Sequence, residues 1–184
     1  MGSVYSELNH KLRELIAAQH VFFVATAPLS PEQHLNLSPK GLESFQVLDD
    51  KTVAYLDLVG SGIETVAHLR ENGRIVILFC TFSGAAKIVR LYGHGRVVEP
   101  VDAEWEDLAG RFPSYTGARS IIVVDLERVA DSCGWGVPLY EYVGERTQLV
   151  EYADNKGPEK LAEYKAKNNA RSIDGLPGLR GVQA

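Results

Sequence analysis

The segment Gly60-Ser61-Gly62 joins an apolar stretch, residues 52–56, to an amphipathic stretch that starts near Glu64. Two glycines allow the backbone to turn tightly and to approach a ligand closely. Ser61 is expected to cap the helix that follows, with Glu64 three residues later completing a capping box. The first turn of such a helix has unpaired N–H donors and the positive end of the helix dipole, which suit a phosphate group. An ordinary capped helix after a strand has the same pattern, so the segment alone does not establish a ligand site.

Two cationic side chains stand where they could assist such a site. Lys40 follows a stretch in which Asn36 and Ser38 share one face of a predicted strand. Arg90 shares one face of another predicted strand with Tyr92. Two cations and a helix N-terminus could together bind a phosphomonoester. Taken singly, either cation is more typical of a solvated charge near a strand end.

Several well-known kinds of site are absent from the sequence. The glycines around His94 lack the third glycine and the strand-to-helix context of a dinucleotide fingerprint. There is no Walker-type phosphate loop and no nucleophile elbow. The five histidines are scattered without a His or Cys partner at metal-ligand spacing, so we expect no metal site. Cys133 lies in a glycine-rich stretch without a designated base, and the sequence identifies no catalytic residue.

Composition favours one globular domain without affinity for nucleic acid or membranes. The chain has 184 residues, of which 45% are hydrophobic and 23% charged, and its net charge is −5. The negative charge argues against nucleic acid as the main partner. The most apolar run, residues 21–27, is too short to span a bilayer, and no secretory signal is visible. Two cysteines do not form a disulfide framework, so we expect a cytoplasmic protein.

Short β-type runs separated by turns dominate the chain, which favours antiparallel pairing in a barrel with flanking helices. We expect a single domain over 1–184, with a core at about 15–130 and a helical or irregular C-terminal extension at about 131–184. The pattern predicts helices over 4–18, 64–72, 103–112 and 158–168, and strands over 21–26, 34–38, 45–48, 52–57, 74–81, 87–98 and 120–129.

Four motifs follow one another along the chain: N-L-S-P-K-G, G-S-G-I-E-T-V-A-H-L, I-V-I-L-F and R-L-Y-G-H-G-R-V. Their order and spacing resemble the pyridoxamine 5'-phosphate oxidase-like FMN-binding family over roughly residues 15–130. Two later segments, S-C-G-W-G-V-P-L-Y and S-I-D-G-L-P-G-L, are similar to one subgroup of that family. The resemblance implies an antiparallel split barrel, mainly β, that forms a homodimer with FMN in two symmetric clefts between the subunits.

The resemblance also implies roles for particular residues. The strand end at Lys40 would lie along the flavin and its ribityl chain, and the loop 61–65 would face the phosphate, with Arg90 nearby. Trp135, between two glycines, is a candidate for stacking on the flavin or on a substrate ring, and the alternative is that it anchors its own loop on the core. The cofactor-binding residues predicted in this way are Asn36, Ser38, Lys40, Ser61, Gly62, Thr65, Arg90 and Trp135.

One departure from the family pattern concerns the phosphate. Pyridoxamine phosphate oxidases have a basic pair where this chain has Glu64 and Thr65. Losing two charge-assisted hydrogen bonds weakens phosphate binding, so Glu64 is expected to point away from the phosphate and to cap the helix. The basic and aromatic C-terminal segment that the full oxidase uses for its substrate has no match here. Oxidation of pyridoxamine phosphate itself is therefore not expected.

The function expected from the resemblance is that of a flavin-dependent oxidoreductase acting on an unassigned small-molecule substrate, with NAD(P)H as a candidate electron donor. A flavin carries the redox chemistry itself, which explains why no acid–base pair or nucleophile stands out. Two alternatives are a deazaflavin-dependent reductase and a non-catalytic protein that binds or stores flavin.

Overall fold

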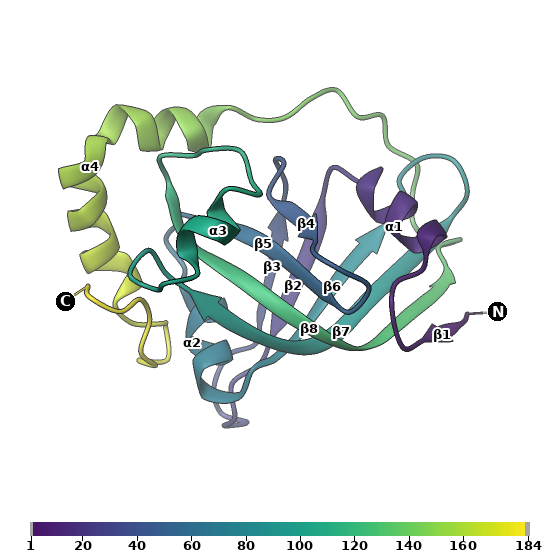
Figure 1. Ribbon diagram of the computed structural model, residues 1–184, viewed down its shortest axis with the longest axis horizontal. Coiled ribbons are helices and arrows are strands. Elements are labelled where there is room, and N and C mark those ends of the chain that lie inside the picture. Colours follow the sequence, from purple (N-terminus) through teal and green to yellow (C-terminus); the bar gives the residue numbers. More distant parts are fainter. Residues whose placement is uncertain (1, 183–184) are drawn as a thin grey trace.

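The computed structural model describes residues 2–182, which form one curled antiparallel sheet with helices around it (Figure 1). The strand order is β3-β2-β6-β7-β8-β5-β4, and β1 pairs with β8. The sheet is an antiparallel split barrel, as predicted. The strands are β1 (Val4–Tyr5), β2 (Phe22–Thr26), β3 (Asn36–Lys40), β4 (Phe45–Val47), β5 (Thr52–Leu58), β6 (Arg74–Cys80), β7 (Lys87–Val98) and β8 (Ala118–Cys133).

Four helices flank the sheet: α1 (His10–Ala17), α2 (Glu64–Asn72), α3 (Trp105–Ala109) and α4 (Gln148–Asn169). Gly157 has φ 71° and ψ 167°, which divides α4 into two helical pieces. An irregular segment, residues 134–147, leads from the end of β8 to α4, and we call it the strap. Figure 1 shows the strap in green, crossing the molecule on its way to α4. Among residues 2–182, no helix combines the length and the apolar character needed to cross a membrane.

The two faces of the sheet carry different apolar clusters because side chains alternate along a strand. The interior of the barrel is filled by fully buried residues such as Val24, Tyr55, Ile77 and Leu91. Neighbouring residues of β5 and β8 point to the opposite face and pack beneath α3 in a second cluster, together with Val98 of β7; its members include Ala54, Leu56, Ile121 and Val123. These two clusters make β5 and β8 the rigid wall on which the site described below is built.

The register of β7 on β8 shifts between Tyr92 and Gly93. A Cβ on Gly93 would collide with the carbonyl oxygen of Asp125 on β8. The interruption of the long strand by glycine therefore marks a close backbone approach, as its position in a strand predicts.

Several predicted element boundaries were wrong. The first helix starts at His10 rather than at residue 4, because the Asn9 side chain caps it by accepting the N–H of Leu12, while Val4 and Tyr5 pair with β8 instead. β8 extends to Cys133, since β7 supplies partners along its whole length. Cys133 thus ends a strand rather than lying in a loop. The final helical region begins at Gln148, ten residues before the predicted start.

Candidate functional site

A cavity of about 670 Å³ lies at the split of the barrel. Its volume falls within the range of roughly 300–1,000 Å³ that is common for small-molecule sites. One wall is the inward face of β3, and the opposite wall runs from the end of β5 through the first turn of α2. Gly144–Arg146 of the strap and Leu149 of α4 complete its rim. The cavity is therefore bounded by segments from three distant parts of the sequence.

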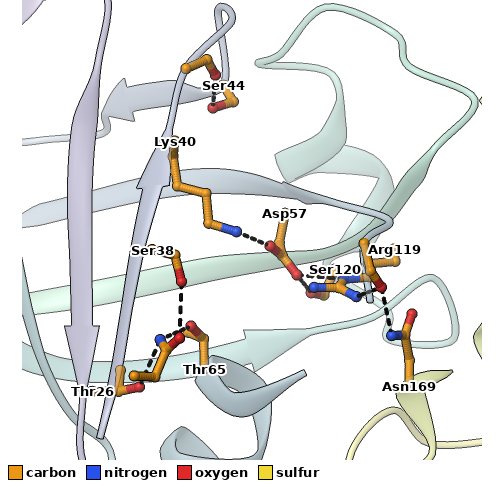
Figure 2. A network of polar contacts seen from close by, with 12 residues as sticks. Thr26, Ser38, Lys40, Ser44, Asp57, Thr65, Arg119, Ser120 and Asn169 are labelled. Atoms are coloured by element: carbon orange, nitrogen blue, oxygen red, sulfur yellow. Dashed lines mark hydrogen bonds and ion pairs between the residues drawn. The ribbon is translucent and has the colours of Figure 1, made fainter. Parts of the chain in front are cut away.

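Asp57 forms ion pairs with two cationic side chains beside the cavity (Figure 2). Its side chain is 1% exposed. Lys40 Nζ lies 2.7 Å from Oδ1, and Arg119 Nε lies 2.7 Å from Oδ2. Burial acts to raise the pKa of Asp57, but the charges of Arg119 and Lys40 and their hydrogen bonds outweigh it and hold the pKa well below its ordinary value of 3.8. Asp57 neutralises only one of the two cations, so this triad (Lys40, Asp57 and Arg119) keeps a net charge of +1.

A β-bulge allows Arg119 to reach Asp57. Asp57 pairs with Ser120 in the register of β5 on β8, whereas Leu58 pairs with Ala118. Arg119 is the extra residue between those two pairs, and a bulge of this kind redirects a side chain. Arg119 and its neighbour Ser120 consequently both contact Asp57, with Ser120 Oγ 3.4 Å from Oδ2.

The polar face of β3 forms a second network, which is uncharged. Ser38 Oγ donates to Asn36 Oδ1 at 3.0 Å, and Asn36 Nδ2 donates to Thr65 Oγ1 at 2.9 Å. The network continues through Thr26 Oγ1 to His68 Nδ1, 2.9 Å away. Burial of His68 lowers its pKa from the ordinary value, despite the opposing effect of nearby carboxylates, and so favours the neutral imidazole. Ser38 and Thr65 converge in Figure 2, which places hydroxyl and amide groups beside the cationic triad.

The start of α2 differs from the sequence-based expectation. The N-cap residue is Ile63, and no side chain caps the helix, so the predicted capping box of Ser61 and Glu64 was wrong. Glu64 Oε1 instead accepts the N–H of Ile173 at 3.2 Å. The carboxylate folds back toward Gly62, where a Cβ would collide with Oε2, and Glu64 lines the cavity. The absent side chain at Gly62 leaves room for the carboxylate, and its direction relative to a bound phosphate stays a prediction.

Five of the eight predicted cofactor-binding residues line the cavity: Asn36, Ser38, Lys40, Gly62 and Thr65. Ser61 is adjacent to it but is not part of its lining. Arg90 lies on the outer face of β7, where Nη1 donates to Ser132 Oγ at 3.2 Å. Trp135 is 86% exposed at the start of the strap. The roles of Arg90 and Trp135 stay predictions that need a second subunit.

The comparisons with known proteins agree with this architecture. The family model described as pyridoxamine 5'-phosphate oxidase matches residues 8–133. The pyridoxamine 5'-phosphate oxidase family protein ustO of Aspergillus flavus is 41% identical over 201 residues, covering 99% of this chain and 80% of that protein. The chain belongs to the pyridoxamine 5'-phosphate oxidase family. In fold it is also similar to HupZ of Group A Streptococcus, with a TM-score of 0.52 and 24% identity over 66% of this chain and 91% of HupZ.

Part of the cavity lining lies outside the region that matches the pyridoxamine 5'-phosphate oxidase family. The family match ends at residue 133, so the strap and α4 lie beyond it. Arg146 of the strap is exposed at the cavity rim, and no ion pair of its side chain occurs within residues 2–182. Lys40 and Arg119, in contrast, are engaged by Asp57. Arg146 is thus a cation of the cavity that remains available to an anionic ligand.

Sequence reasoning missed Asp57 and Arg119 as residues of the site, and also Asn169 of α4. A signal for Asp57 existed, because it ends an apolar strand on the same face as Tyr55. Arg119 has no such signal, since its direction depends on the bulge. Asn169 is fully buried and donates to Gly60 across 109 residues of sequence. No local sequence pattern predicts a contact between residues that lie 109 positions apart.

Proposed function

We propose that this protein binds FMN in the cavity at the barrel split and acts as a flavin-dependent oxidoreductase on a small-molecule substrate. The observation that carries the proposal is that one cavity, in a protein of this family, combines a charged group of residues with an uncharged polar face. The triad supplies a net positive charge, and the β3 face supplies neutral donors and acceptors. Leu56, Leu58 and Val59 add apolar surface. A planar ring system with a polar edge and an anionic tail suits this combination.

The residues present fit each part of the cofactor. Ser38, Asn36 and Lys40 offer hydrogen bonds for the carbonyl and N–H groups of the ring and for the ribityl hydroxyls. The first turn of α2, the Thr65 hydroxyl and Arg146 are available for the phosphate. A bound flavin would supply the redox chemistry, and the side chains of the cavity would bind and orient it. Glu64 also lines the cavity at the start of α2, and its negative charge reduces the attraction for the phosphate.

Glu64→Gln is expected to tighten FMN binding severalfold and to leave riboflavin binding unchanged. The amide removes a negative charge near the proposed phosphate position, yet it still accepts the N–H of Ile173. Fluorescence titration with each flavin measures the two dissociation constants. Glu71→Gln is the matched control, because Glu71 accepts the N–H of Leu29 at the other end of α2. Weaker FMN binding by Glu64→Gln would make Glu64 a direct ligand instead.

We also propose a homodimer, supported by an uncovered apolar face of the sheet. The register places Leu37, Ala25, Val76 and Tyr92 in one row across β3, β2, β6 and β7, facing away from the barrel interior. Leu37 is 70% exposed. The next row contains Pro39, Phe23, Leu78, Arg90 and Ala130. A second copy would cover this face and bring Arg90 into the interface.

Light scattering is expected to give twice the chain mass of 20.2 kDa at micromolar concentration. Leu37→Asp should shift the protein toward the monomer without unfolding it, because a charge in the centre of an interface must be desolvated. Val101→Asp is the control, since Val101 is 76% exposed near α3, away from the apolar face. A wild-type monomer would refute the dimer.

The oxidoreductase proposal is tested by loading the protein with FMN and adding NADH or NADPH without oxygen. We expect the flavin absorption to bleach and then to recover through turnover when an electron acceptor is added. A flavin that stays oxidised with both donors, but is reduced by dithionite as the positive control, would instead identify a flavin-binding protein without this activity. The absorption spectrum of the protein as purified, before any flavin is added, separates FMN from a deazaflavin, because their absorption maxima differ.

A further inference from the structure

The C-terminal extension contacts the cavity wall at both ends of one short segment, residues 60–64. Asn169 Nδ2 donates to the carbonyl oxygen of Gly60 at 2.9 Å. Four residues later, the N–H of Ile173 donates to Glu64 Oε1 at 3.2 Å. Gly60, Gly62 and Glu64 all line the cavity. The segment that precedes α2 is thus held by residues 169–173, which lie beyond the part of the chain that matches the family model.

The carbonyl of Gly60 links this contact to the charged triad. Arg119 Nη1 donates to the same oxygen at 3.2 Å, while Arg119 Nε donates to Asp57. Figure 2 shows the continuous chain of contacts from Asn169 through Arg119 and Asp57 to Lys40 on β3. A carbonyl oxygen has two lone pairs, so one oxygen can accept from both Asn169 and Arg119. The Gly60 carbonyl is therefore a second anchor of the Arg119 guanidinium, beside Asp57.

The burial of Asn169 fixes the orientation of its side-chain amide toward Gly60. The residue is fully buried, and its Oδ1 has no hydrogen-bond partner in the described structure. A buried acceptor without a partner is costly, so the bond from Nδ2 to Gly60 is made while Oδ1 stays unsatisfied. Only the Nδ2 end can face the Gly60 carbonyl, because two oxygens would repel each other. The orientation of the amide is thereby defined by the loop it holds.

We infer that Asn169 is a positioning residue of the cavity: it fixes the Gly60 carbonyl, and through it the Arg119 guanidinium and the first turn of α2. The C-terminal helix is then a component of the ligand site rather than an appendage. The effect on ligand affinity rests on the proposed flavin function, whereas the effect on the order of segment 60–64 does not. Two measurements can therefore separate a failure of this inference from a failure of the proposed function.

The first measurement is hydrogen exchange of the ligand-free protein. The amides of Val59 and Ala67 flank the segment and bond to the carbonyls of Gly117 and Ile63. Asn169→Leu removes the donor to Gly60 and is expected to speed exchange of peptides covering 58–67 by about threefold to tenfold. Asn169→Ser, whose hydroxyl is too short to replace the contact, should have the same effect and serves if the leucine variant does not fold.

Asn168→Leu is the matched control for hydrogen exchange, because Asn168 Nδ2 bonds only to the Tyr164 carbonyl within its own helix.

The second measurement compares dissociation constants. Both Asn169 variants should weaken the binding of FMN by about threefold to tenfold and the binding of riboflavin by less than about twofold. Exchange over 58–67 that is equal in the wild type and both Asn169 variants, or altered as much by Asn168→Leu, overturns the inference. Faster exchange in a protein that binds no flavin supports the positioning role and refutes the proposed function.

Discussion

Asp57→Ala is expected to lower the free energy of unfolding by about 3–5 kcal/mol. The substitution leaves Lys40 and Arg119 close together without a counter-ion, and the Arg119 side chain is only 6% exposed. Urea denaturation followed by circular dichroism measures the change. Asp50→Ala is the control, because Asp50 forms an ion pair with Arg13 that is largely exposed, and its loss should cost less than about 1 kcal/mol. Equal losses for the two variants would contradict a structural role for the triad.

The same carboxylate predicts a pH dependence of stability. The folded-state pKa of Asp57 lies below its ordinary value of 3.8, so its interactions stabilise the fold fully above that value. Their contribution falls as the pH drops below about 4 toward the folded-state pKa. The wild type should therefore lose stability more steeply than Asp57→Asn below about pH 4. Parallel curves for the two proteins would show that Asp57 does not titrate as this geometry requires.

Lys40→Met is expected to weaken FMN binding by about tenfold to a hundredfold and riboflavin binding much less. Without Lys40, the remaining Asp57–Arg119 pair is neutral and the triad loses its net positive charge. The methionine keeps most of the side-chain volume, so the cavity should retain its shape. Fluorescence titration of both flavins gives the ratio of affinities.

Lys87→Met is the matched control for that ratio. Lys87 pairs with Asp131 at 2.8 Å and does not line the cavity, so its removal should leave the affinity for each flavin unchanged. If Lys40→Met lost equal affinity for FMN and for riboflavin, Lys40 would contact the ring or the ribityl chain and would not contribute to attraction of the phosphate.

Much of the sheet could be predicted because its signals are local. The alternation along β2 and the apolar runs of β5 and β6 identify strands from side-chain type alone. The extent of β8 could not be predicted in this way. Residues 130–133 have little β-strand character, and they are ordered as a strand because Lys87–Arg90 of β7 supplies hydrogen-bond partners. Pairing over that sequence separation overrides local preference.

The site was predictable on β3 and at the start of α2, where polar residues share a face or follow a glycine turn. It was not predictable where long-range contacts decide the geometry. Glu64 has the spacing of a capping residue, but the Ile173 amide competes for its carboxylate. Arg119 looks like a charge at a strand start, and only a bulge opposite Asp57 turns it inward. Arg146 belongs to an irregular strap, whose path depends on the surfaces it crosses.

The most direct test of the central claim is a titration of ligand-free protein with FMN, followed by flavin fluorescence and by the absorption spectrum of the complex. We expect saturable binding of one FMN per chain, with a perturbed absorption band, and tighter binding of FMN than of riboflavin because of the net positive charge of the triad and the charge of Arg146. Absence of saturable binding for FMN, riboflavin and a deazaflavin alike would contradict the assignment of this cavity as a flavin site.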